Sequence, residues 1–352
     1  MTVKVFVVDD SAVVRQSIAY ILSGDPEMVL VGSAPNPLLA IDAIRKSQPD
    51  VLLLDIEMPG MDGLTFLRQV MATYPIPTVI CSTLSTEGSR IALDALSAGA
   101  IAVLAKPKLG LKQFLDDSRR EMIQTLKVAA RSKPRLRTAV PDGTIKAVVL
   151  RTPVFSPAHT FAMNKPVVIG SSTGGTQALE LVLTSLPADA PGIAITQHMP
   201  EKFTAMYAQR LAGICAIRVR EAKDGDRLER GVALIAPGGL HMQLRKAAGQ
   251  YFVHVADGPP VNRHKPSVDV LFKSTSECAG RDALGIIMTG MGDDGARGMK
   301  VLHDGGARTI AQNEETCVVF GMPKEAIKLQ AVDDILPLDQ IARAILQFDS
   351  GT

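Results

Sequence analysis

Five short apolar runs, each followed by a stretch with helical spacing, fill residues 1–125. The runs are nearly continuous in hydrophobic residues, which is typical of parallel strands covered on both faces. Ser11 is placed to cap the first helix. Five strand–helix units predict an α/β fold, a doubly wound parallel sheet with strand order 2-1-3-4-5. The runs are KVFVVDD, MVLVGSA, DVLLLDI, PTVICS and AIAVLAKP.

The pattern then lapses and later returns. Residues 126–164 mix proline, basic and small residues without a steady period, so we expect a linker there. Strand–helix alternation resumes in residues 165–352, which predicts a second doubly wound α/β domain. Two further segments, GVALIAPGGLHMQL and YFVHVADG, predict a β-hairpin insertion whose turn is Pro237-Gly238-Gly239.

Composition narrows the class of protein. Apolar residues make up 46% of 352 residues, which is enough for two cores. The net charge of +2 comes from scattered basic residues and argues against a nucleic-acid partner. The four cysteines lie far apart without zinc-ligand spacing, which favours free thiols in a reducing compartment. Because the N-terminus lacks signal-peptide features and no apolar stretch approaches about 20 residues, we expect a cytoplasmic protein that is not inserted in a membrane.

Polar side chains gather where the first five strands end. Asp9 and Asp10 follow the first strand and Asp55 ends the third, and these strands are neighbours in the predicted sheet. Three converging carboxylates repel one another unless a hard cation such as Mg²⁺ lies among them. Ser82 and Lys106 end the fourth and fifth strands at the same edge. The sequence therefore predicts a magnesium and phosphate site here.

The motifs VDD, LLLDIEMPGMDG and LAKP make residues 3–120 resemble a response-regulator receiver domain. The resemblance implies that Asp55 accepts a phosphoryl group from a histidine kinase. It also implies that Asp9, Asp10 and Asp55 hold Mg²⁺, and that Ser82 and Lys106 sense the acyl phosphate. The stretch APNPLLA departs from the family pattern, but only in the second loop.

The glycine-rich turn IGSSTGG in the second half raises two alternatives, a phosphate cradle or a serine nucleophile. No lysine follows Gly175, so the turn is not a P-loop, and the dinucleotide fingerprint is absent as well. A serine at such a turn usually caps a helix. Ser172 becomes a candidate nucleophile because His198 and the pair Asp293-Asp294 end other strands of the same sheet.

The second half also resembles a known family, the CheB family of protein-glutamate methylesterases, in which a receiver precedes the catalytic domain. The segments that carry the resemblance are IGSSTGGTQAL, TQHMP, IAPGGLHM, HKPSVDVLF, TGMGDDGA and VFGMPKEA. It implies that Ser172 is the nucleophile, His198 the base and Asp294 the acid that orients it. Thr173 and Met291 would shape the oxyanion and substrate pocket.

One position departs from this family. Asp293 stands where most members have asparagine, which leaves open which aspartate holds His198. We prefer Asp294 because it occupies the family's aspartate position, just before the glycine.

The resemblance implies a phosphorylation-activated hydrolase of glutamate γ-methyl esters on chemoreceptors, with methanol as product and no metal at the esterase site. Deamidation of receptor glutamines at the same site is expected as well. Three other classes fit the sequence less well: a binding module without activity, a regulator that binds a nucleotide in the glycine-rich turn, and a DNA-binding output domain. The complete Ser-His-Asp set argues against an inactive binding module, and the missing P-loop lysine argues against nucleotide binding. The α/β pattern argues against a DNA-binding output domain.

Overall fold

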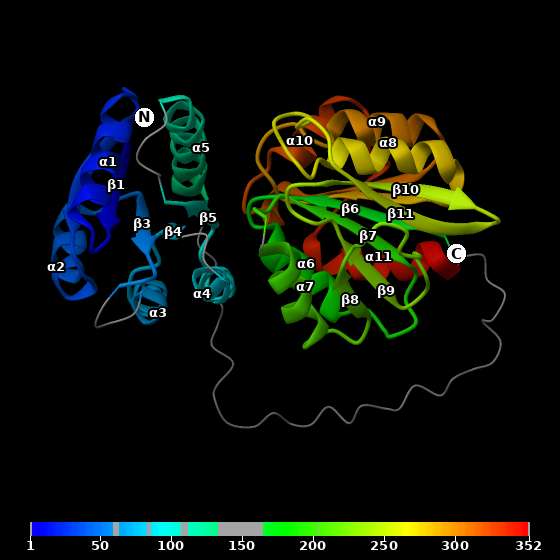
Figure 1. Ribbon diagram of the computed structural model, residues 1–352, viewed down its shortest axis with the longest axis horizontal. Coiled ribbons are helices and arrows are strands. Elements are labelled where there is room, and N and C mark those ends of the chain that lie inside the picture. The colour runs from blue at the N-terminus through cyan, green and yellow to red at the C-terminus, as the bar shows by residue number, and fades with distance from the viewer. Residues whose placement is uncertain are drawn as a thin grey trace.

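The computed structural model describes residues 2–58, 63–82, 86–106, 112–132, 165–201 and 203–350. It contains two α/β units, an N-terminal one in blue and cyan and a C-terminal one in green to red (Figure 1). Most of the predicted linker lies outside the described residues. None of the helices in the described part of the chain is long and apolar enough to cross a bilayer.

The N-terminal unit is the predicted parallel sheet in the order β2-β1-β3-β4-β5. Alternate residues of each strand face opposite helical layers: Val5 and Val7 pack toward α1 and α5, and Phe6 and Val8 toward α2, α3 and α4. Ser11 caps α1, as predicted, by accepting from Val14 N. The strands are β1 (Val3–Val8), β2 (Met28–Ala34), β3 (Val51–Asp55), β4 (Thr78–Ser82) and β5 (Ala102–Ala105), and the helices are α1 (Ala12–Ser23), α2 (Pro37–Ser47), α3 (Gly63–Thr73), α4 (Thr86–Ser97) and α5 (Lys112–Arg131).

The C-terminal unit has a seven-stranded parallel sheet in the order β14-β13-β12-β6-β7-β9-β8. Helices α6, α7 and α11 cover one face, and α8, α9, α10 and a two-stranded hairpin cover the other (Figure 1). The strands of the sheet are β6 (Val167–Ser171), β7 (Ile193–Gln197), β8 (Arg218–Glu221), β9 (Val232–Ile235), β12 (Leu284–Ile287), β13 (Arg308–Gln312) and β14 (Asp334–Leu336). The helices are α6 (Gly175–Thr184), α7 (Phe203–Ala212), α8 (Val268–Cys278), α9 (Ala296–Asp304), α10 (Met322–Lys328) and α11 (Leu338–Ser350), with short 3-10 turns η2 (Gly280–Asp282) and η3 (Glu314–Thr316).

The predicted hairpin insertion exists, but its turn is elsewhere. The hairpin pairs β10 (His241–Ala247) with β11 (Gln250–Ala256), and its turn is Ala248-Gly249, both with positive φ. The predicted turn at Pro237-Gly238-Gly239 is therefore wrong. It connects β9, a buried strand of the main sheet, to the hairpin. The error arose because VALI is apolar at every position, as a strand buried on both faces requires, whereas a hairpin strand with one solvated face alternates.

The two units touch through α4. Gln177 Nε2, on α6, donates to the carbonyls of Leu96 (2.5 Å) and Ala100 (3.2 Å) at the end of α4. Arg210 of α7 lies 3.5 Å from the Asp94 carboxylate. Val318 of the C-terminal unit packs against the core on the α5 side of the N-terminal sheet. The contact therefore lies beside the first turn of α6, which follows the glycine-rich turn directly.

Candidate active site and phosphorylation site

The glycine-rich turn presents Ser172 at the carboxyl end of β6. The Ser172 amide donates to Thr289 O (3.0 Å), which ties the turn to the strand next to β6, and its carbonyl accepts from Gly175 N. Gly174 has a φ of +77°, a conformation that favours glycine, and caps α6. Within the described residues, the Thr173 and Gly174 amides make no hydrogen bond. Two unpaired amides at a helix N-terminus suit the binding of an oxyanion.

A glutamine that the sequence reasoning missed holds this turn against β7. Ser171 is fully buried and donates to Gln197 Oε1 (2.6 Å). The Gln197 amide group donates to Ser172 O (2.9 Å) and His198 O (3.0 Å). Gln197 therefore fixes the backbone of the candidate nucleophile relative to that of the candidate base. A polar residue at the end of a buried strand, in AITQHMP, was the available signal.

Gly290 is a second residue that the sequence reasoning missed. A Cβ added at Gly290 would lie 2.8 Å from Ser172 Cβ and 2.2 Å from Met322 Sδ, so the backbone can pass this close only without a side chain. The half-buried Met291 follows it, and Thr289 Oγ1 donates to Thr173 O (2.9 Å). Thr173 and Met291 are the two residues predicted to shape the pocket. Thr173 directly follows Ser172, and Met291 directly follows Gly290, which packs against Ser172.

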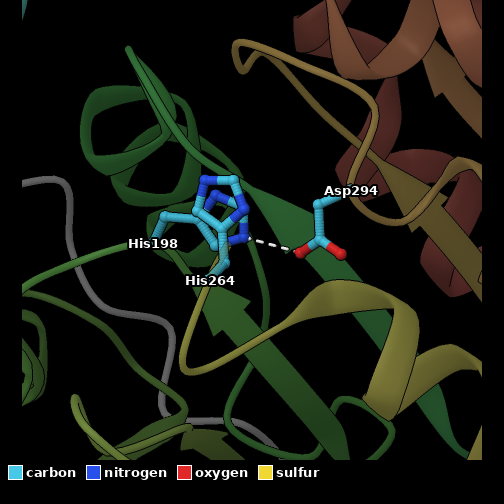
Figure 2. A group of neighbouring side chains, drawn as sticks. All are labelled: His198, His264 and Asp294. Atoms are coloured by element: carbon cyan, nitrogen blue, oxygen red, sulfur yellow. Dashed lines mark hydrogen bonds and ion pairs between the residues drawn. The ribbon is translucent and has the colours of Figure 1, made fainter. Parts of the chain in front are cut away.

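His198 and Asp294 meet at the same edge of the sheet (Figure 2). The His198 Nε2 and Asp294 Oδ2 atoms are 2.8 Å apart. Because a carboxylate accepts here, Nε2 carries the proton and Nδ1 is left with the lone pair. Nδ1 is buried and has no hydrogen-bond partner among the described residues, so the Ser172 hydroxyl is not bonded to it in this structure. Such bonds are often long before substrate binds. Asp293 makes no hydrogen bond to His198.

Asp294 is fully buried and surrounded by donors. Its Oδ1 accepts from Ser267 Oγ (2.7 Å) and Asn262 Nδ2 (2.9 Å), and its Oδ2 accepts from Val268 N (2.7 Å) as well as His198. Burial alone would raise the pKa of Asp294. This effect of burial is outweighed by the hydrogen bond and charge of His198 and by the hydrogen bonds from Asn262 and Ser267. Together they hold the pKa of Asp294 well below the usual range. Asp294 is therefore a permanent anion facing His198.

A second imidazole lies flat against the first. The rings of His264 and His198 are stacked, with centroids 3.8 Å apart and planes inclined by 6° (Figure 2). Burial, and then the neighbouring charge of His198, lower the pKa of His264 to about 4. His264 is therefore neutral near pH 7.

The predicted carboxylates of the N-terminal unit also converge. Oxygens of Asp9, Asp10 and Asp55 lie within 4.8 Å of one another. Lys106 Nζ is 2.7 Å from Asp55 Oδ2 and 3.3 Å from Asp9 Oδ2. Ser82 is buried where β4 ends, beside them in the sheet.

The carboxylates suit Mg²⁺. Within the described part of the chain, the buried Asp9 Oδ2 has the 3.3 Å ion pair with Lys106 but no hydrogen bond. Burial raises the pKa of Asp9, against the lowering effect of Lys106, and Asp55 raises it further. A carboxylate that is hard to ionise for these reasons gains from a hard cation, and the oxygen-only donor set is the one that Mg²⁺ prefers.

The two sites together define a class of protein. Serine, histidine and aspartate at the carboxyl ends of parallel strands are the set of residues that many hydrolases use, and here they share a chain with a unit whose aspartates and lysine suit a phosphoryl group. Residues 167–345 match the CheB methylesterase family, and residues 5–115 match the response regulator receiver domain. The chain belongs to the CheB methylesterase family, and the resemblance noted in the sequence is confirmed.

Whole-length relatives agree with this. A protein of Dechloromonas aromatica, named protein-glutamate methylesterase/protein-glutamine glutaminase 2, is 55% identical and covers 98% of each chain. One of the same name from Xanthomonas campestris pv. campestris is 56% identical over 97% of this chain and 99% of its own. The crystal structure of the Thermotoga maritima CheB methylesterase catalytic domain is 37% identical. It covers 52% of this chain and 98% of its own, with a TM-score of 0.51.

The partner choice of His198 leads to a first prediction. Asp294→Asn should lower kcat by up to about 10⁴, because an amide cannot hold the imidazole in the tautomer that leaves Nδ1 basic. Asp293→Asn should change kcat by less than about fivefold, since Asp293 does not bond to His198. Steady-state hydrolysis of an ester substrate measures both. A reversed ranking would show that Asp293 is the functional acid.

The lowered pKa of His264 leads to a second prediction. Between its folded value of about 4 and its ordinary 6.5, the unfolded chain binds a proton that the folded chain does not. The free energy of unfolding is therefore unaffected by the protonation of His264 above pH 6.5. As the pH falls from 6.5 toward 4, protonation of His264 in the unfolded chain lowers this free energy by at most about 3 kcal/mol. Urea unfolding at several pH values should show a shallower pH dependence for His264→Phe than for the parent. Equal slopes would contradict the assignment.

Proposed function

We propose that this chain hydrolyses glutamate γ-methyl esters on chemoreceptors, releasing methanol, and that phosphorylation of Asp55 raises the rate. The observation that carries the proposal is the 2.8 Å contact between His198 Nε2 and Asp294, which leaves His198 Nδ1 available as a base at the end of the strand next to the Ser172 turn. The names of the whole-length relatives support the choice of substrate.

The reaction follows from the geometry. Ser172 Oγ attacks the ester carbonyl while His198 Nδ1 takes its proton, and Asp294 stabilises the imidazolium that results. The Thr173 and Gly174 amides hold the oxyanion at the start of α6, with Met291 alongside. Collapse of the tetrahedral intermediate breaks the bond to methoxide, which takes the proton from His198 and leaves as methanol. Water then attacks the acyl-serine by the same steps in reverse order.

Deamidation needs no further groups. A glutamine side chain presents the same carbonyl, and His198 would protonate the leaving nitrogen to release ammonia instead of methanol. The two turn amides would act on the acyl part, which the two substrates share, and Gln197 holds the turn in the same way for both. We therefore propose that receptor glutamines are deamidated at Ser172 as well, in keeping with the second half of the relatives' names.

We propose that Asp55 is the phosphorylation site, with the chemotaxis histidine kinase as phosphodonor in the cytoplasm. Asp9, Asp10 and Asp55 would hold Mg²⁺, which neutralises charge on the incoming phosphoryl group when bound. Lys106 Nζ already lies 2.7 Å from Asp55 Oδ2 and can pair with the phosphoryl group when Asp55 becomes an acyl phosphate. Ser82 lies at the same edge of the sheet, where its hydroxyl would donate a hydrogen bond to a phosphoryl oxygen.

Phosphorylation can reach the esterase through α4. Ser82 immediately precedes the connection to α4, and Lys106 directly follows β5. Between these two residues, the chain makes its contacts with α6 and α7, through Asp94, Leu96 and Ala100. A shift at the phosphorylation site therefore acts on both ends of the segment that covers the flank of α6. We propose that the unphosphorylated contact restricts access to Ser172 and that phosphorylation weakens it.

The nucleophile assignment has a direct test. Ser172→Ala should abolish methanol release from methylated receptor membranes, a loss of several orders of magnitude. Ser171→Ala is the matched control. It removes the bond to Gln197 and should cost about 1 kcal/mol in stability, yet keep most of the activity. Folding of both variants is checked by thermal melting. Equal loss of activity in the two folded variants would reject Ser172.

The coupling has a separate test. Gln177→Ala removes the hydrogen bonds to Leu96 and Ala100, so it should raise the activity of the unphosphorylated protein. The fold-activation by acetyl phosphate and Mg²⁺, which is about 5- to 150-fold for usual couplings, should then be smaller than in the parent. Gln209→Ala, on the exposed face of α7, is the control and should change neither. Asp55→Asn should lose the response and keep basal turnover.

A fragment of residues 160–352 completes this test. It should be active, faster than the unphosphorylated whole chain, and unresponsive to the phosphodonor. A fragment slower than that chain would contradict restriction by the N-terminal unit.

A further inference from the structure

A two-residue turn brings two side chains to the candidate triad. Val261 and His264 exchange both backbone hydrogen bonds, at 2.9 and 3.1 Å, around Asn262 and Arg263. Asn262 then bonds to Asp294, and the His264 ring covers one face of His198. One short turn thus touches both the base and the acid that orients it.

We propose that this turn is a positioning device for the catalytic base, in which the ring of His264 fixes the plane of His198. His264 is a positioning residue because it acts through His198. The inference rests on the proposed function and adds to it a residue outside the Ser-His-Asp set.

The need for such a residue follows from the contacts of His198. An imidazole can be held at either ring nitrogen or on a face. Nε2 is held by Asp294, but Nδ1 has no hydrogen-bond partner in the part of the chain that the structure describes and must keep its lone pair for the Ser172 proton. A single hydrogen bond at one ring atom leaves the ring free to tilt about that bond. Face-to-face contact at 3.8 Å with a second flat ring removes this freedom without using Nδ1.

The charge of His264 is suited to this role. A cation stacked on His198 would oppose the imidazolium that forms in the reaction. Burial and the nearness of His198 keep His264 neutral down to about pH 4, so the positive charge of the pair falls on the ring that Asp294 faces. A neutral ring can also stabilise the adjacent imidazolium through its face.

The turn itself is strained, as positioning segments often are. Asn262 and Arg263 have φ values of +49° and +68°, in the left-handed region that favours glycine. Asn262 offsets part of this cost, since its amide also donates to the buried Asp269 (2.7 Å). Asp269 in turn accepts from Gly298 N at the first turn of α9. Non-glycine residues held in this region cluster at functional sites, where surrounding contacts impose them.

The experiment compares His264→Ala, which removes the ring, with His264→Phe, which keeps a flat ring but no nitrogen. Esterase activity of the full-length protein should show kcat reduced about 10- to 100-fold in the alanine variant, with KM within about twofold. The phenylalanine variant should keep most of the parent's kcat. His254→Ala, which removes a histidine paired with Asp224 on the exposed hairpin, is the control and should match the parent.

A second readout does not depend on turnover. The His198 Nε2 proton, bonded to Asp294, should give a downfield resonance in ¹⁵N-labelled protein. This resonance should persist in His264→Phe and broaden or vanish in His264→Ala. A structural role alone would change the melting temperature without this difference between the two variants. If His264→Ala does not fold, His264→Leu takes its place with the same expectation, since it fills the volume without a flat face.

Three results would overturn the inference: an unchanged kcat in the alanine or leucine variant, a phenylalanine variant that is as slow as the alanine one although folded, or the same Nε2 proton signal in all variants. A parent protein that does not hydrolyse the ester would instead reject the proposed function. The resonance would then still report whether His264 holds the ring of His198.

Discussion

A single buried carboxylate organises the active site. Asp294 is shut off from solvent, and an unpaired charge there would cost several kcal/mol. The chain meets this constraint with donors from His198, Asn262, Ser267 and the amides of Val268 and Asp269. Four of the five come from the short stretch 262–269, so the loop before α8 wraps around the carboxylate. The position of His198, the stacked His264 and the start of α8 all depend on satisfying this one charge.

The cost of negative charge at a sheet edge also shapes the N-terminal site, but there part of that charge has no partner among the described residues. Asp9, Asp10 and Asp55 also converge at the carboxyl edge of a parallel sheet, but one lysine cannot neutralise three carboxylates. This excess of negative charge suits a site that takes up a cation and a phosphoryl group. The esterase carboxylate, by contrast, is fully hydrogen-bonded by the chain and needs nothing from outside. The contact through α4 links the unit that carries the first site to α6 and α7 of the unit that carries the second.

Sequence reasoning located residues whose chemistry is unusual for their place along the chain. Acids at strand ends and a serine in a glycine-rich turn stand out, as Asp55 and Ser172 do. Supporting residues do not stand out in this way. Gln197 and Asn262 are ordinary polar residues, and only the folded chain brings Gln197 to two backbone carbonyls or Asn262 to two carboxylates. The misplaced hairpin turn has a similar origin, because Ala248-Gly249 is a weaker turn signal than Pro237-Gly238-Gly239.

By itself, the sequence determined the two α/β units, the strand order of the first and the family, and it supplied the candidate site residues. These follow from local periodicity and from motifs, which are properties of neighbouring positions. The family resemblance already favoured Asp294 over Asp293, but only the tertiary structure showed that Asp294 meets His198, that His264 stacks on His198, and that α4 rests against α6 and α7. Two adjacent aspartates look alike along the chain. They differ only in the direction that the backbone gives each side chain, and that direction is set by packing between segments far apart in sequence.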